Sequence, residues 1–279
     1  MSTLLLKVLP SLLVLLFVPL SALAGPPFIT DDPEPVERHH WEFNNAVTLT
    51  HDQSGTTGSA PNVDVNYGVM PGVQLHVQPQ LAYASAPGLR SFGAGDSEFG
   101  VKWRLTPGAD GGEGDGAAAG KGDDNGAVAM PGDVGETAGS GGWMISLYPL
   151  LDVPTGDAKR NLGAGVTSVF LPVWFQRTFG RWTAYGGGGY RRTQGSDNRN
   201  TWAGGWVMLY AFSEGLSLGG EVYGNTAATS GGRASVGFNL GGSLALASDY
   251  NLLFSAGRGL RNVAATNQAS VCLALQVLR

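Results

Sequence analysis

Alternation of apolar and polar residues with a period of two is the feature that most constrains how this chain can fold. In residues 62–70 every second side chain is apolar, and the residues between them are polar or small. The same pattern returns in residues 72–84, 97–106 and 269–277, whereas no long stretch keeps the 3.6-residue period of a helix. One face of each segment is therefore apolar and the other polar, which predicts an all-β chain.

The number and length of the expected strands favour a closed antiparallel transmembrane β-barrel over a soluble β-sandwich. Alternation alone fits both folds, because a sandwich buries its apolar face and a membrane barrel turns it to lipid. We expect about twelve strands, most of them close to the roughly ten residues that cross a membrane, and an even number returns both chain ends to one side. The expected strands are residues 41–51, 62–70, 72–84, 97–106, 143–153, 165–178, 182–192, 201–212, 216–224, 233–246, 250–258 and 269–277.

The connections between these strands sort by length, as they do in outer-membrane barrels, which have short periplasmic turns and longer external loops. This pattern places both chain ends on the periplasmic side. The tight turns are expected at residues 70–72, 179–181, 213–215 and 247–249. The longer polar loops are expected at residues 52–61, 85–96, 154–164, 193–200, 225–232 and 259–268.

Aromatic residues gather near the expected strand ends, the depth that amphipathic rings prefer in a membrane. Those near periplasmic ends are Trp41, Tyr67, Trp103, Trp143, Trp182, Phe212 and Tyr250, and those near external ends are Tyr83, Phe99, Tyr190 and Trp202.

The first 24 residues have the layout of a secretory signal peptide. Lys7 precedes an apolar run over residues 12–20, and Ala22-Leu23-Ala24 supplies a small-residue cleavage site before Gly25. We therefore expect export, a periplasmic N-terminal tail over residues 25–40, and the barrel over residues 41–279. The single cysteine, Cys272, allows no intramolecular disulfide, so the fold must be stable without one.

Acidic charge is concentrated in one segment. The chain carries 17 basic and 22 acidic residues, and residues 107–142 hold seven of the acids against Lys121 alone. This glycine-rich connection is too poor in apolar residues to order itself, so we expect a disordered periplasmic insertion. In the rest of the chain the acidic and basic charges are balanced, and the absence of a basic excess argues against a nucleic-acid partner.

Four motifs resemble, in order, a family of outer-membrane proteins assigned to the meta pathway of phenol degradation. They are the start Gly-Pro-Pro-Phe-Ile-Thr-Asp-Asp-Pro at residues 25–33, Gly-Asp-Ser-Glu-Phe-Gly-Val-Lys-Trp-Arg at 95–104, Leu-Asp-Val-Pro-Thr-Gly-Asp at 151–157, and Gly-Glu-Val at 220–222. The resemblance implies a barrel that acts as a passive channel or transporter for small hydrophobic or aromatic solutes. The end Val277-Leu278-Arg279 departs from the terminal aromatic that the barrel assembly machinery, an expected partner, usually favours.

The polar faces of the strands are expected to line the lumen. These groups either line a pathway for solutes or pair with one another into a plug, and the sequence favours neither. The candidates are Glu42, Asp64, His76, Gln78, Gln80, Glu98, Lys102, Arg104, Arg191 and Glu221.

An enzyme is not expected. A rim hydrolase acting on lipids would need a serine beside a histidine at the external rim, where only His51 lies and no motif ties a serine to it. A purely structural barrel is the other alternative. No cofactor is expected, and no metal site either, because the pair His39-His40 beside acids of the tail matches no known ligand spacing.

Two surfaces carry expectations about contacts. Phe28 and Ile29 are apolar, so we expect the tail to enter the mouth of the lumen. The external loops hold an excess of arginine, and arginine binds phosphate oxygens in a bidentate fork. We therefore expect Arg191, Arg192 and Arg199 to contact lipopolysaccharide, with outer-membrane lipid as the surrounding partner.

Overall fold

The computed structural model of the chain describes residues 26–106 and 142–279. The expected signal peptide and nearly all of the expected insertion lie outside these ranges. No helix in the described ranges is long and apolar enough to cross a membrane. The strands are β1 (Trp41–Asp52), β2 (Gly55–Met70), β3 (Val73–Gln78), β4 (Gln80–Ala86), β5 (Leu89–Ala94), β6 (Ser97–Arg104), β7 (Met144–Leu147), β8 (Leu150–Val153), β9 (Ser168–Phe179), β10 (Trp182–Thr193), β11 (Thr201–Ser213), β12 (Leu216–Asn225), β13 (Ser235–Ala247), β14 (Tyr250–Arg261) and β15 (Ala269–Leu278), with a 3-10 turn η1 (Ala158–Arg160) and a short helix α1 (Val263–Thr266).

The fifteen segments form a barrel of twelve strands, because three of the strands are interrupted. Pro79 separates β3 from β4, Gly95-Asp96 separates β5 from β6, and Tyr148-Pro149 separates β7 from β8. Proline has no N–H to give to a ladder, which accounts for two of the three breaks. The ladder continues across each break. β2 pairs with both β3 and β4, and β9 with both β7 and β8. Across the break at Gly95-Asp96, β4 pairs with β5 and β3 with β6.

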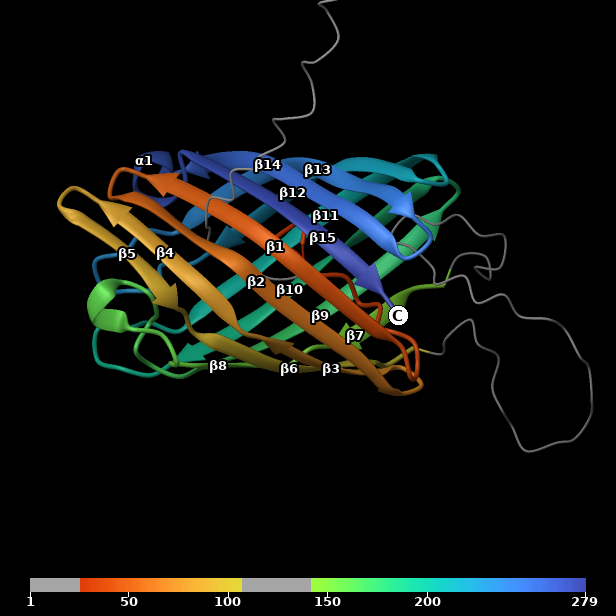
Figure 1. Ribbon diagram of the computed structural model, residues 1–279, viewed down its shortest axis with the longest axis horizontal. Coiled ribbons are helices and arrows are strands. Elements are labelled where there is room, and N and C mark those ends of the chain that lie inside the picture. Colours follow the sequence, from red (N-terminus) through yellow and green to blue (C-terminus); the bar gives the residue numbers. More distant parts are fainter. Residues whose placement is uncertain (1–25, 107–141) are drawn as a thin grey trace, which may run out of the picture.

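The sheet closes on itself through β1, which pairs antiparallel with β2 on one side and β15 on the other. The first and last residues of the barrel meet at one end of it, because Trp41 N donates to Arg279 O and Arg279 N donates to Trp41 O at 2.9 Å. Figure 1 shows the strands tilted around the closed barrel, with α1 at one end and the C-terminus at the other. The closed antiparallel barrel of twelve strands expected from the alternation is confirmed. We call the end with Trp41 and Arg279 periplasmic, as expected from the sequence, and the opposite end external.

The outer face of the barrel is apolar. Leu171, Val222 and Leu240 are among the large apolar side chains that it exposes. Aromatic pairs lie near both ends: Trp41 with Tyr67 and Trp182 with Tyr210 near the periplasmic end, with ring centroids 4.3 and 4.8 Å apart, and Tyr190 with Trp202 near the external end, at 5.2 Å. An apolar belt between aromatic rings is the surface that a bilayer requires.

The sequence-based prediction of two long external loops, at residues 52–61 and 85–96, is wrong. Residues 55–61 belong to β2, and residues 85–94 fall largely within β4 and β5, so the turns there are as tight as the periplasmic ones. Small and polar residues in both segments hide the alternation that would mark a strand. In the structure β4 pairs with β2 and with β5, which shows that both segments are strands. The external loop after β8 is a true loop, fastened by the carboxylate of Asp96, which accepts N–H bonds from Gly156 (3.0 Å) and Ala164 (2.6 Å).

An arginine placed on the outer face should destabilise the barrel according to depth. Leu240 lies in the middle of β13 and is 63% exposed, whereas Leu246 lies on the same face near the periplasmic end and is 56% exposed. In lipid bilayers Leu240→Arg should lower the free energy of unfolding by about 2–4 kcal/mol and Leu246→Arg by about 0–1 kcal/mol. Denaturant unfolding in liposomes measures both, and equal losses would contradict the membrane position assigned here.

Candidate functional site: a lumen filled by the N-terminal tail

The inner surface of the barrel has a polar wall and an apolar wall. The polar wall is built by β1, β2, β3 and β6, whose inward side chains are carboxylates, amides, His76 and Lys102. The opposite wall holds two apolar clusters, supplied by β8, β9, β10 and β11 with neighbouring residues. The first cluster is Tyr148, Leu150, Phe170 and Trp174, and the second is Tyr185, Val207 and Leu209 with Phe28 of the tail.

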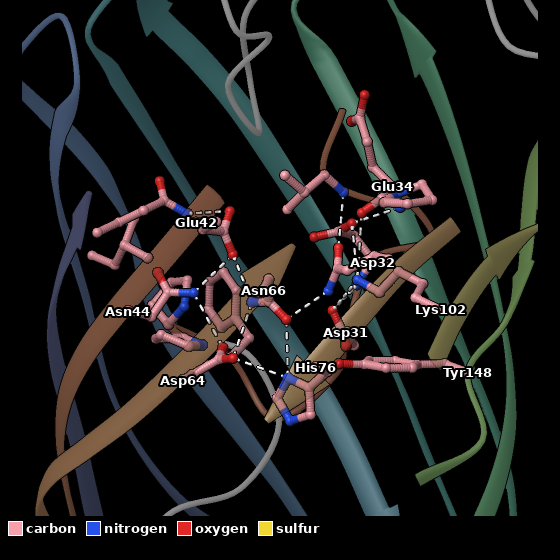
Figure 2. Close-up of a pocket in the computed structure, with 18 of the residues that line it drawn as sticks. Asp31, Asp32, Glu34, Glu42, Asn44, Asp64, Asn66, His76, Lys102 and Tyr148 are labelled. Atoms are coloured by element: carbon pink, nitrogen blue, oxygen red, sulfur yellow. Dashed lines mark hydrogen bonds and ion pairs between the residues drawn. The ribbon is translucent and has the colours of Figure 1, made fainter. Parts of the chain in front are cut away.

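Asp64 and Asn66 form the centre of the hydrogen-bond network on the polar wall (Figure 2). Asn66 Nδ2 donates to Asp64 Oδ1 at 2.9 Å, and Gln74 Nε2 donates to Asn66 Oδ1 at 2.6 Å. His76 Nδ1 lies 2.9 Å from Asp64 Oδ1, and its Nε2 lies 3.3 Å from Glu98 Oε1. The histidine therefore links carboxylates of β2 and β6 across β3.

Glu42 occupies the same wall and is held by amides. Its carboxylate accepts from Asn44 Nδ2 (2.8 Å), Asn66 Nδ2 (3.1 Å) and Gln276 Nε2 (3.0 Å). These donors come from β1, β2 and β15, so Glu42 links β1 to the two strands that flank it. Neutral amide donors satisfy the oxygens of a carboxylate but leave its negative charge in place.

The tail folds back from β1 into the lumen, so the expectation that it enters there is confirmed, and it goes deeper than the mouth. Next to β1, Arg38 forms a parallel bridge with Gly68. Position 68 has no room for a side chain, because a Cβ on Gly68 would lie 1.9 Å from Glu37 O. Further in, Val36 N donates to Gln74 Oε1 at 2.8 Å, and Ser146 Oγ donates to Pro33 O.

Lys102 connects the tail to the polar wall. Its Nζ lies 3.2 Å from Asp31 Oδ1 and 3.8 Å from Asp32 Oδ1, and it stands 4.9 Å from the ring centroid of Tyr148. Figure 2 shows this group beside the Asp64 and His76 network. A buried ammonium group needs such partners, because removing its charge from water without them would cost roughly several kcal/mol.

Glu221 of β12 anchors the inner end of the tail. Its side chain is almost fully buried, with the residue 2% exposed, and it accepts the backbone N–H groups of Ile29 (3.1 Å) and Thr30, together with Asn239 Nδ2 (2.7 Å). Gly205 makes room for this contact, because a Cβ there would lie 2.0 Å from Thr30 Oγ1. Two of the motifs noted in the sequence, at residues 25–33 and 220–222, therefore meet inside the barrel.

Two carboxyl groups of the tail are affected by burial. Burial raises the pKa of Glu34 to about 7, and the negative charge of Asp32 acts in the same direction. Burial also raises the pKa of Asp31 to about 6, against the opposing attraction of Lys102. A docked tail therefore binds protons more readily than a free one, so its docking weakens as the pH rises from about 4 to about 7.

A cavity of about 130 Å³ remains between the tail and the two walls. Polar groups of β1, β2, β3 and β6 line one side, Tyr148, Leu150, Tyr185 and Leu209 line the other, and Leu253 of β14, which packs on Ala46 of β1, adds a further apolar residue. The space is therefore amphipathic. It fits a small molecule with an apolar body and a polar group.

The structure places the expected lumen residues on the inner face. Asp64, His76, Gln78, Lys102 and Glu221 are buried there. All of them except Glu221 line the cavity, together with Glu42 and Glu98. Arg104 follows Lys102 on the same face of β6. Gln80 lies further out and donates to Asp96 O at 3.1 Å. Among the described residues, no cluster of three or more His, Cys, Asp or Glu residues could hold a metal ion.

Arg191 corrects the set expected to contact lipopolysaccharide. Its guanidinium turns inward, where it binds Asp152 and donates to Ser168 Oγ at 3.0 Å, and it stands over the Phe170 ring at 4.8 Å. Arg192 and Arg199 are exposed. The sequence predicts Arg191 both in the lumen and in contact with lipopolysaccharide, because alternation gives the face of a residue but not the direction that a long side chain takes.

Several functional residues were missed from the sequence. Asn44, Asn66 and Gln74 were readable, because alternation puts them on the face of the candidates that were named. Tyr148 was not, because it stands at the break between β7 and β8, where alternation is interrupted. Asn239 was not readable either, since only its neighbour across the ladder, Glu221, belongs to a noted motif.

Comparisons with known proteins agree with this architecture. The model of a family described as "Putative MetA-pathway of phenol degradation" matches residues 43–270, well over half of the chain. The solved structure of the COG4313 outer membrane channel from Pseudomonas putida F1 is similar, with a TM-score of 0.61 and 13% identity over 92% of this chain and 100% of that one. The KdgM porin is similar with a TM-score of 0.51 and 9% identity in its complex with disordered oligogalacturonate, over 85% of this chain and 98% of that one. No curated protein matches the sequence.

Loss of the Glu221 carboxylate should release the tail. A hydrogen bond to a charged acceptor contributes about 1.5–3 kcal/mol, so Glu221→Ala should raise the undocked population at least about tenfold. Chymotrypsin cleavage after Phe28, which is 2% exposed when docked, measures that population when the truncated chain is weighed by mass spectrometry. Glu214→Ala, in the turn between β11 and β12, is the matched control. Equal cleavage in the two variants would show that Glu221 does not hold the tail.

Proposed function

The chain belongs to the MetA-pathway phenol-degradation family, and from this premise we propose that it is an outer-membrane channel for small hydrophobic or aromatic solutes, gated by its own tail. The observation that supports this most directly is the amphipathic cavity between the tail and the two walls. A pathway for sugars or ions alone needs no apolar wall, because contact between an apolar wall and water costs free energy.

The tail makes the lumen narrow without filling it. It is held by separate contacts at Gln74, Ser146, Lys102 and Glu221, each of which can be made and broken without disturbing the ladder. In this proposal the docked tail keeps hydrated solutes out, and a small apolar solute passes beside it or displaces it.

A rim hydrolase is not proposed. His51 Nδ1 lies 2.8 Å from Thr56 Oγ1 at the external rim. The hydroxyl beside that ring therefore belongs to a threonine, whereas the rim hydrolase considered from the sequence would use a serine.

The channel proposal can be tested by removing the tail. Deletion of residues 26–38 should raise the single-channel conductance in planar bilayers several-fold, because the deletion vacates the centre of the lumen. Retained heat-modifiable mobility on gels checks that the barrel is intact. Absence of conductance in both the full chain and an intact deleted barrel would refute a channel and favour a closed structural barrel.

The solute preference is tested in the same recordings. Benzyl alcohol should reduce the current through the deleted barrel at concentrations where glycerol does not, because its ring can occupy the apolar wall. Tyr185→Ser with Leu209→Ser should abolish the difference between the two alcohols. A difference that survives both substitutions would place the solute elsewhere.

We also propose that the exposed arginines of the external rim contact lipopolysaccharide. Arg192 follows Tyr190 on the outward face of β10, just outside the pair of Tyr190 with Trp202, and Arg199 lies in the next external loop. Lipid phosphates occupy this level of the outer leaflet, and exposed guanidinium groups are suited to bind them.

The rim contact predicts a stability loss that depends on the lipid. Arg192→Gln with Arg199→Gln should lower the midpoint of thermal unfolding by roughly 2–4 °C more in lipopolysaccharide-containing membranes than in detergent. Arg177→Gln, near the periplasmic end of β9, is the control and should show no such difference. Equal losses in both environments would mean that the rim arginines serve only their own loops.

A further inference from the structure

We propose that the cavity is a binding site for a small organic ammonium ion, held beside Glu42 with its apolar body against the opposite wall. The inference rests on the proposed channel function and narrows it, because it favours positively charged solutes over neutral ones of the same shape.

The charges that line the cavity are unequal. Among its lining residues, as the described ranges give them, seven are carboxylates and two are lysine or arginine. The carboxylates are Asp31, Asp32, Glu34, Glu37, Glu42, Asp64 and Glu98, and the two cations are Lys102 and Arg279. A concave site lined by one sign of charge attracts the opposite charge.

The positive groups already have partners away from Glu42. Lys102 binds Asp31 and Asp32, Arg279 binds Asp249, and His76 lies between Asp64 and Glu98. Glu42 is held by amide donors on three sides. Its negative charge is therefore the one on this wall that is best placed to attract a cation from the cavity.

Asn44 gives a second, independent indication. It lines the cavity, it is 3% exposed, and its Nδ2 donates to both Glu42 and Asp64. Its Oδ1 is buried and has no hydrogen-bond partner in the described part of the chain. A buried acceptor without a donor is costly, and an ammonium group has three N–H donors and no acceptor.

Lys102 shows that this lumen can hold an ammonium group. Its Nζ is bound by two carboxylates and lies over the Tyr148 ring at 4.9 Å. An aromatic face and carboxylates together are the usual partners of organic cations. Across the cavity, Tyr185 of β10 and Leu209 of β11 line the space that the apolar body of a ligand would occupy.

The test compares two ligands of one shape on the unmodified full chain. Isothermal titration calorimetry in detergent at pH 8 would measure the binding of phenethylammonium and of its neutral counterpart, 2-phenylethanol. Phenethylammonium should bind at least about tenfold more tightly, because only it has a charge to place beside Glu42. Equal affinities, or tighter binding of anionic phenylacetate, would overturn the proposal. If only 2-phenylethanol bound, the ammonium site would be refuted and the proposed preference for small hydrophobic solutes would stand. If neither ligand bound, both proposals would be contradicted.

A variant locates the site. Glu42→Gln should lower the affinity for phenethylammonium about tenfold and leave that for 2-phenylethanol unchanged, whereas Glu214→Gln, in the turn between β11 and β12, should change neither. Unchanged ammonium affinity in a Glu42→Gln barrel that keeps heat-modifiable mobility would remove Glu42 from the site. If that variant does not fold, the comparison of ligands on the unmodified chain decides.

Discussion

The whole architecture depends on one requirement: inside a bilayer, every backbone N–H and C=O must be bonded within the protein. Alternating strands meet it only when the last strand returns to the first, and here β15 pairs with β1 along ten residue pairs. Closure with twelve strands fixes a width that the inward side chains do not fill by themselves. The remaining space explains why a segment outside the ladder, the tail, can be accommodated, and why its carbonyl and amide groups find partners on the walls.

The tail and the walls compensate each other chemically. Backbone N–H groups that would be unbonded in a lumen are given to Glu221 and Gln74, and the carboxylates of Asp31 and Asp32 are matched by Lys102. Phe28 covers the apolar cluster around Tyr185 and Leu209, which would otherwise meet water. A lumen with polar walls alone would fill with water, and a lumen with apolar walls alone would exclude it. The combination leaves a small cavity with both characters.

How much was readable from the sequence follows from what alternation reports. It gives the face of a residue, so the strand set and the lumen position of residues such as Asp64, His76 and Lys102 were accessible. It does not report where small residues continue a strand, so it predicts loops at 55–61 and 85–94, where the structure has strands. It is also silent on pairing between distant segments. That Glu221 would bind Ile29 and Thr30, or that Arg191 would turn to Asp152, depends on the closed shape, because 30 or more residues separate the members of each pair. The apolarity of Phe28 carried the one long-range contact that sequence could suggest.

The position of the tail in the chain has a consequence for the order of events during assembly. The tail precedes β1 and is joined to it at the periplasmic end, and its contacts with Glu221 and Ser255 lie midway along β12 and β14. The tail can therefore reach every one of its partners from the periplasmic opening, with no part of it crossing the membrane. Barrel closure and tail docking are then topologically independent steps. The narrowing of the lumen by the tail is thus equivalent to a ligand-like binding event between two parts of one chain, set by an effective concentration.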